Sequence, residues 1–201
     1  MIDFRPCFGS LTLAGYGWEP ADWSLTFYPD DLPPDWHVSY YATEFNSVLL
    51  PAGGWQAPLM DAAFWLSELG ADFSYYVEIN HELMQSGVWA QVQVAVERYL
   101  REQVAGLLVE NLAMPALPVA WKEYFPVHVL QPGQLLADMP PIGAMAQIAL
   151  LRANQPLSPM ALRNIFEQMQ QGTSHRDIVL FVDASWATVG QIRLMQQLYG
   201  V

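Results

Sequence analysis

Short apolar runs alternate with longer amphipathic segments along the chain, and this alternation restricts the fold more than any other feature of the sequence. The runs that predict strands are Leu11–Ala14, Ser47–Leu50, Phe73–Ile79, Gly106–Val109, Val127–Leu130, Ile148–Arg152 and Ile178–Asp183. Helical periodicity and capping signals predict helices at Trp36–Phe45, Ala57–Leu69 and Val88–Val104, after Ser158-Pro159, and in a last segment that ends near Tyr199. About seven strands separated by helices predict a parallel α/β fold.

The length of the chain narrows this prediction. A complete eightfold TIM barrel takes about 250 residues, whereas this chain has 201 residues, enough for one domain over 1–201. We therefore expect a TIM-barrel-like fold that is reduced or distorted, abbreviated in the Pro-rich stretch Met114–Pro141. A doubly wound sheet is the alternative, but Gly15-Tyr16-Gly17 lacks the third glycine of a phosphate-binding turn.

The net charge of the chain indicates which kinds of macromolecule are favoured as partners. Twenty acidic residues against eight basic ones give a net charge of −12, and 53% of the residues are hydrophobic, as in a folded protein. Because the few basic residues are scattered, nucleic acid is disfavoured as a partner. An acidic surface favours a basic protein partner, although solubility alone also explains such a surface.

The sequence also predicts a location. No apolar run is long enough to cross a bilayer, so we expect no association with a membrane. Met1–Pro6 lacks a basic leader followed by an apolar segment, which predicts no secretory signal. The single cysteine, Cys7, excludes an internal disulfide and is expected to be an inert thiol. Together these features predict a cytoplasmic protein.

Several motifs in the first quarter of the chain occur in a recognisable order. They are Gly15-Tyr16-Gly17-Trp18, Phe27-Tyr28-Pro29, Leu32-Pro33-Pro34, Tyr40-Tyr41 and Phe45-Asn46-Ser47-Val48. This order resembles the opening βαβ unit of the domain-of-unknown-function 72 (DUF72) family, whose members look like TIM-barrel proteins. The resemblance implies a barrel, and it implies no settled activity.

The resemblance weakens further along the chain. Arg152 keeps the arginine of the family's closing motif, and Asn154 and Asp183 stand near its His-Gly and Asn positions. Glu78 occupies roughly the place of a family lysine, and Leu49 replaces an acidic residue. The family's mid-chain motif is not recognisable. The polar positions of a family site are therefore mostly substituted, and the chain is similar to a shortened, divergent member of the family.

Candidate site residues lie where the predicted strands end, because barrel enzymes place their chemistry at the carboxyl ends of strands. On the third strand, alternation puts Tyr76, Glu78 and Asn80 on one face, which predicts Glu78 and Asn80 at the barrel mouth. The weak catalytic candidates are Glu78, His81 and Asp183. The ligand-binding candidates are Trp18, Trp23, Asn46, Asn80, Arg152 and Asn154. The Arg152 guanidinium suits a small anionic ligand, or forms an ion pair with Asp183.

The remaining site types are not supported by spacing. Carboxylates and imidazoles at the strand ends include Glu110 and His128, but there is no HExxH or His-x-His, so we expect no metal and no cofactor. No G-x-S-x-G elbow surrounds Ser185. We therefore predict a non-catalytic binding or interaction protein on a degenerate barrel. The alternative is a small hydrolase-type enzyme that uses Glu78, His81, Arg152 and Asp183 at the strand ends. The oligomeric state is not predicted.

Overall fold

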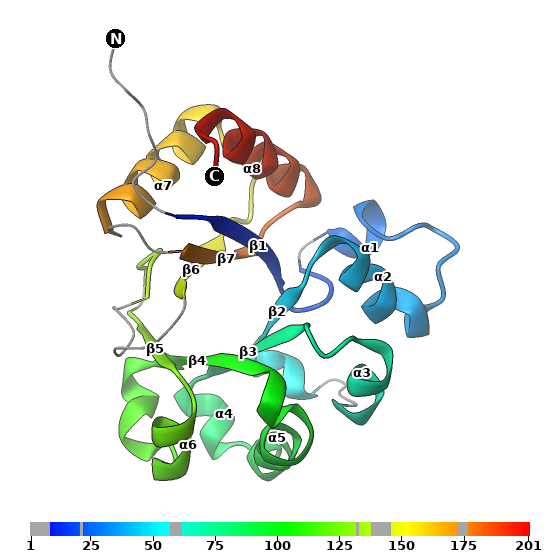
Figure 1. Cartoon of the computed structure of the whole chain (residues 1–201), viewed down its shortest axis with the longest axis vertical. Helices are drawn as coiled ribbons and strands as arrows, with labels where there is room; N and C mark the ends of the chain where they lie inside the picture. The colour runs from blue at the N-terminus through cyan, green and yellow to red at the C-terminus, as the bar shows by residue number, and fades with distance from the viewer. Residues whose placement is uncertain (1–8, 21, 57–61, 132, 138–145, 173–176) are drawn as a thin grey trace.

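Seven parallel strands form a sheet that curls into a nearly closed barrel with helices around its outside (Figure 1). The computed structural model describes residues 9–20, 22–56, 62–131, 133–137, 146–172 and 177–201. The strands are β1 Leu11–Tyr16, β2 Ser47–Leu50, β3 Ser74–Ile79, β4 Val104–Glu110, β5 Val127–Leu130, β6 Ala146–Arg152 and β7 Asp177–Asp183. The predicted α/β, TIM-barrel-like fold is confirmed. Cys7 lies outside the described residues.

The helices connect successive strands and cover the outer face of the sheet (Figure 1). The α-helices are α1 Trp23–Thr26, α2 His37–Glu44, α3 Ala62–Glu68, α4 His81–Gln85, α5 Trp89–Val94, α6 Val119–Tyr124, α7 Pro159–Gly172 and α8 Trp186–Tyr199. Tighter or wider turns are η1 Pro34–Trp36, η2 Ala52–Gln56, η3 Ala95–Leu100, η4 Arg101–Gln103 and η5 Asn111–Ala116, of which η3 is a π-helix. None of the described helices is long and apolar enough to cross a membrane.

The strand order explains the shape of the barrel. The sheet runs β5-β4-β3-β2-β1-β7-β6, so β5 and β6 are its two ends and the barrel is open between them. The opening falls in the connection after Leu130, which overlaps the end of the Pro-rich stretch expected to be abbreviated. Part of this connection lies along β6, where Leu136 pairs with Ala149 in an antiparallel bridge. Two backbone hydrogen bonds flank the bridge, Ala137 N to Ile148 O at 3.0 Å and Leu150 N to Leu135 O at 2.8 Å.

Side-chain alternation divides the core into two layers. On β3, Tyr75, Val77 and Ile79 face the helices, while Tyr76 faces the barrel interior, as the sequence predicted. The interior is small and is filled by Ala14, Leu49, Tyr76, Leu108, Ala137, Ile148, Leu150, Val179 and Phe181. The larger outer layer joins the sheet to its helices. The alternation thus directs the polar end of β3 into the barrel mouth.

An aromatic group in the outer layer ties the first helices to β1 and β2. Tyr41 is fully buried; its hydroxyl accepts a hydrogen bond from Gly15 N at 2.6 Å and donates one to Ser47 O at 2.9 Å. Trp36, the residue at which this helix was predicted to begin, is 66% exposed. The reason is that α2 begins at His37, after the 3-10 turn Pro34–Trp36.

We predict that Tyr41→Phe destabilises the protein by roughly 1–3 kcal/mol, because it leaves a buried amide and a buried carbonyl without their partner. The measurement is urea unfolding of the variant and of the unchanged protein. Tyr40→Phe is the matched control, since Tyr40 lies on the same helix and is only half buried. An equal effect of both substitutions contradicts the bridging role of the Tyr41 hydroxyl.

His128 is buried inside the barrel on β5, with 2% of its surface exposed. Its ring lies against Gly106, where an added Cβ would come within 3.1 Å of Nε2. Nδ1 has no hydrogen-bond partner among the described residues, and burial lowers the pKa of His128 from 6.5 to about 4. The folded protein therefore holds this imidazole neutral where the unfolded chain protonates it.

We predict that His128 makes the protein lose stability as the pH falls from about 6.5 to about 4, since only the unfolded chain takes up the proton there. The loss from this group is roughly 3 kcal/mol at the lower pH. Urea unfolding at pH 7 and pH 4.5 measures it, with His128→Leu as the comparison. If the variant loses as much stability as the unchanged protein on acidification, the group responsible is another one.

Candidate functional site

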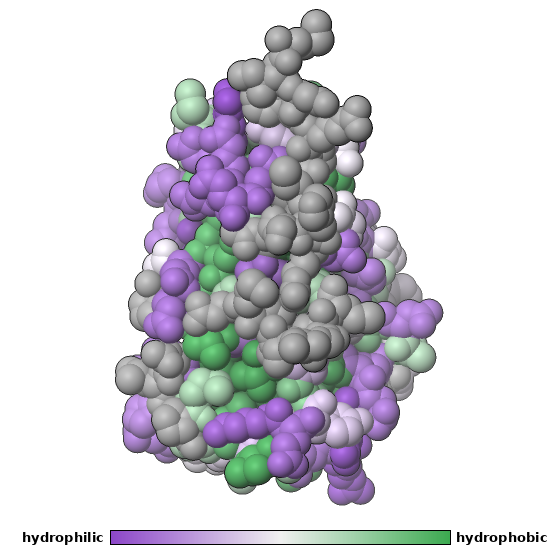
Figure 2. Space-filling view, turned by 60° about the vertical axis from the view of Figure 1, so that its left-hand side comes forward, coloured by the Kyte–Doolittle hydropathy of each residue, from purple (hydrophilic) through white to green (hydrophobic). Residues whose placement is uncertain are grey.

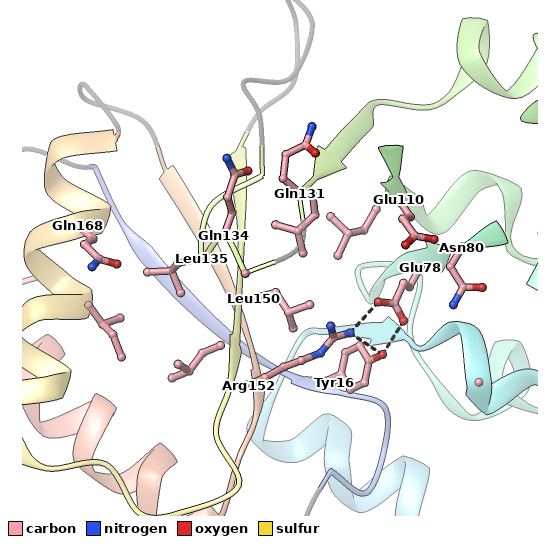
Figure 3. Close-up of a pocket in the computed structure, with 16 residues that line it drawn as sticks. Tyr16, Glu78, Asn80, Glu110, Gln131, Gln134, Leu135, Leu150, Arg152 and Gln168 are labelled. Atoms are coloured by element: carbon pink, nitrogen blue, oxygen red, sulfur yellow. Dashed lines mark hydrogen bonds and ion pairs between the residues drawn. The ribbon is translucent and has the colours of Figure 1, made fainter. Parts of the chain in front are cut away.

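A cavity of about 490 Å³ opens at the carboxyl ends of the strands and extends toward the opening between β5 and β6. Its walls come from the strand ends, from the connection after β5 and from α7 (Figure 3). The lining residues are Tyr16, Gly53, Glu78, Asn80, Leu108, Glu110, Leu130, Gln131, Gly133, Gln134, Leu135, Leu150, Leu151, Arg152, Ile165 and Gln168. This is the end of a barrel at which ligands and substrates bind.

Three side chains from three strands meet on one wall of the cavity. Glu78 at the end of β3 accepts a hydrogen bond from the Tyr16 hydroxyl at 2.5 Å, and Arg152 Nη2 donates to Glu78 Oε1 at 2.8 Å. Arg152 Nη2 also donates to the Tyr16 oxygen at 2.9 Å (Figure 3). The guanidinium lies 4.8 Å from the centroid of the Tyr16 ring. These contacts connect β1, β3 and β6 across the barrel mouth.

The Glu78 carboxylate is fully engaged. Besides Tyr16 and Arg152, the backbone amide of Ala52 donates to Glu78 Oε2 at 3.0 Å. Both carboxylate oxygens therefore accept hydrogen bonds, and only 14% of the side chain is exposed. The side chain of Arg152 is 50% exposed, so one partner is covered and the other faces the cavity.

The surroundings keep Tyr16 neutral. Burial raises the pKa of the Tyr16 phenol far above its ordinary value, and the negative charge of Glu78 raises it further. The phenol therefore acts as a hydrogen-bond donor to Glu78. The pKa of Asp183, at the end of β7, is also raised, by partial burial that outweighs the attraction of Arg152. Asp183 Oδ2 lies 3.9 Å from Arg152 Nε, at the outer limit of an ion pair.

The ends of β3 and β4 contribute a second polar group. Glu110 accepts a weak hydrogen bond from His81 N at 3.3 Å, and no ion pair with another described residue involves its carboxylate. Asn80 caps α4, with Oδ1 accepting from Leu83 N at 2.8 Å. Its amide nitrogen is left on the cavity side, where Figure 3 shows Asn80 and Glu110 next to each other.

The far side of the cavity is neutral. Gln131 and Gln134 come from the connection after β5, and Gln168 comes from α7, across the cavity from Glu110 (Figure 3). Leu135 and Leu150 lie between these two sides. Charges thus lie at one side of the cavity and Gln168 at the other, with Leu135, Leu150 and the other two glutamines between them (Figure 3).

Some of the residues singled out from the sequence come together here. Glu78, Asn80 and Arg152 line the cavity, and Asp183 lies beside Arg152. The predicted pairing of Arg152 with Asp183 is present as a long contact, while the shorter partner of Arg152 is Glu78. His81 contacts the site through its backbone amide, and its exposed ring bonds Gln85.

The other predicted residues lie elsewhere. Trp23 is fully buried and donates from Nε1 to Ala184 O at 2.8 Å, and Trp18 packs edge-on against Tyr41 in the outer layer. Asn154 is exposed beyond the end of β6 and does not line the cavity. Asn46 precedes β2 and lines a separate groove near the opposite end of the barrel.

Sequence reasoning did not assign Tyr16 or the three glutamines to the site. Tyr16 was predictable, since it lies two residues after the inward-facing Ala14 on β1 and so shares its face. Gln131, Gln134 and Gln168 carry no local signal, because a connection and a helix bring them to the cavity. Among the described residues, no group of three or more His, Cys, Asp or Glu side chains is arranged to hold a metal ion.

Comparison with known proteins bears on the fold. No protein-family model and no curated protein matches the sequence. The structure is similar to the crystal structure of a DUF72 family protein from Enterococcus faecalis V583, with a TM-score of 0.57 over 97% of this chain and 99% of that chain. The chain has the fold of a DUF72 family protein. The predicted resemblance is confirmed at this level, while the sequence identity of 10% leaves the activity undetermined.

We predict that Arg152 and Glu78 stabilise the protein jointly. In a double-mutant cycle with Arg152→Met and Glu78→Gln, the double variant should lose about 1 kcal/mol less than the sum of the single losses. Urea unfolding of the four proteins measures this coupling. The exposed pair Arg163 and Glu167, with a nitrogen–oxygen distance of 2.7 Å on α7, is the control and should show a smaller coupling. Additive losses at Arg152 and Glu78 contradict the prediction.

Proposed function

We propose that the chain is a shortened, divergent relative of the DUF72 family that binds a small polar molecule in the barrel mouth without converting it. The similarity of the fold over 97% of the chain supports the relationship. The position of the cavity at the carboxyl ends of the strands supports a binding site, since this is where barrel proteins hold their ligands.

One observation carries the non-catalytic part of the proposal. The Glu78 carboxylate, which lines the cavity, already accepts hydrogen bonds from Tyr16, Ala52 and Arg152. A general base needs a free lone pair directed at the proton that it removes. Because Glu78 has both oxygens occupied, its arrangement suits the positioning of Arg152 and Tyr16 better than proton transfer.

A hydrolase-type enzyme is the second candidate, and Glu110 is the observation in its favour. Its carboxylate lines the cavity and has only one long hydrogen bond among the described residues. A hydrolase would use Glu110 to activate water, with Arg152 orienting the substrate.

The compartment and a protein partner belong to the proposal too. We propose a reducing compartment such as the cytoplasm, because the chain has a single cysteine, and the net charge of −12 suits a basic protein partner. The proposals about the compartment and the protein partner do not depend on what binds in the cavity.

The cavity is tested by blocking it. A Cβ at Gly53 would meet nothing within 4 Å, so Gly53→Trp adds a large side chain to the cavity wall without a clash at Cβ. Gly70 is equally open but does not line the cavity, and Gly70→Trp is the matched control. Small polar metabolites are screened by thermal shift, and hits are measured by calorimetry. We expect binding that Gly53→Trp abolishes and Gly70→Trp leaves unchanged.

Each hit is then incubated with equimolar protein, and the mixture is analysed by mass spectrometry. The proposal predicts that the ligand is recovered unaltered. A product that disappears with Glu110→Gln favours the hydrolase. If both tryptophan variants leave the binding unchanged, the ligand binds outside the barrel mouth and the proposal is wrong about the site.

A further inference from the structure

We infer that the cavity takes a small aliphatic amine, whose ammonium group pairs with the carboxylate of Glu110. This inference rests on the proposed function and names the chemical class of the ligand. It follows from the charges at the mouth, from the unoccupied polar groups and from the shape of the cavity.

Among the described residues at the barrel mouth, one carboxylate, that of Glu110, has no positively charged partner. Arg152 contacts Glu78 at 2.8 Å and lies 3.9 Å from Asp183, so the single cation is shared between two acidic groups. Glu110 forms no ion pair with any other described residue, and its hydrogen bond to His81 N is 3.3 Å long. A partly buried carboxylate is stabilised by a cation and destabilised by an anion. The cavity therefore favours a positively charged group beside Glu110.

The glutamine side chains of the cavity also suit an ammonium group, whether beside Glu110 or at the opposite end of the ligand. Among the described residues, no hydrogen bond occupies the side chains of Gln131, Gln134 or Gln168, so their carbonyl oxygens are available acceptors on the cavity wall. An ammonium group has three donors and no acceptor. A second amine at the far side of the cavity would meet the side-chain oxygen of Gln168, which lies across the cavity from Glu110 (Figure 3).

The middle of the cavity suits methylene groups. Leu135 and Leu150 line it between Glu110 and Gln168 (Figure 3). On the outer surface of this side of the molecule, Figure 2 shows hydrophobic side chains among hydrophilic ones. A chain of methylenes with an amine at each end matches this order, whereas a sugar places hydroxyl groups against the leucines.

The charge of the whole protein acts in the same direction. With a net charge of −12, the chain attracts cations and repels anions at a distance, in a manner that added salt weakens. The small anionic ligand expected from Arg152 alone would meet Glu78, Glu110 and Asp183 in the same mouth.

Three ligands of equal length test the inference, since they differ mainly in the charge of their ends. They are 1,4-diaminobutane, 1,4-butanediol and succinate, each titrated into the full chain by calorimetry at low salt. We expect the diamine to bind at least about tenfold more tightly than the diol, and succinate not to bind. Added sodium chloride should weaken the binding of the diamine and leave that of the diol unchanged.

Protein variants assign the effect to Glu110. Glu110→Gln keeps an acceptor for His81 N and removes the charge, so it should reduce the affinity for the diamine by about tenfold or more and bring it near that of the diol. Glu123→Gln on the exposed face of α6 is the control and should change nothing. Gly53→Trp should abolish binding of every ligand that enters the cavity.

The inference is overturned if succinate or the diol binds as tightly as the diamine, or if Glu110→Gln leaves the affinity for the diamine unchanged. It is also overturned if none of the three ligands binds. The proposed function survives each of these results provided that another compound binds in a manner that Gly53→Trp abolishes. Binding in the barrel mouth, the part of the proposed function tested here, fails when no ligand shows that dependence.

Discussion

The opening between β5 and β6 is the constraint on which the rest of the structure depends. Parallel strands that curve into a barrel need neighbours on both edges, and here the sheet ends at β5 and β6. The connection after β5 supplies part of the missing edge through the bridge between Leu136 and Ala149. The cavity extends to this side of the barrel, where Gln134 and Leu135 of that connection and Gln168 of α7 line it.

The contact between Arg152 and Glu78 follows from this shape. It connects β6, at one end of the sheet, to β3 across the mouth, with Tyr16 of β1 between them. A largely covered carboxylate is stable only when its oxygens have donors, and Glu78 has three of them. The arrangement thus holds the barrel mouth in place and leaves Glu110 as the carboxylate with a free side toward the cavity.

The likeness to a DUF72 family protein at 10% identity has a physical explanation. A barrel of this kind requires strands with the correct alternation and an interior filled to the correct volume, and many residue combinations satisfy both. Here large and small side chains complement one another inside, since the rings of Tyr76 and Phe181, with centroids 4.9 Å apart, share the interior with the small Ala14. The polar groups at the mouth are under no such requirement, which is why the fold and the chemistry of the site are separate questions.

The strands, their parallel arrangement and the inward face of β3 follow from the sequence, because alternation and chain length depend on local order alone. The same rule directed attention to Glu78, Asn80 and Arg152 at strand ends. It could not find their partners, since the three contacts among Tyr16, Glu78 and Arg152 join residues 62, 74 and 136 positions apart. Residues so far apart along the sequence come into contact only when the sheet curls into a barrel. Asn46 misses the cavity for a different reason: it precedes β2 and therefore lies at the amino end of that strand, away from the mouth.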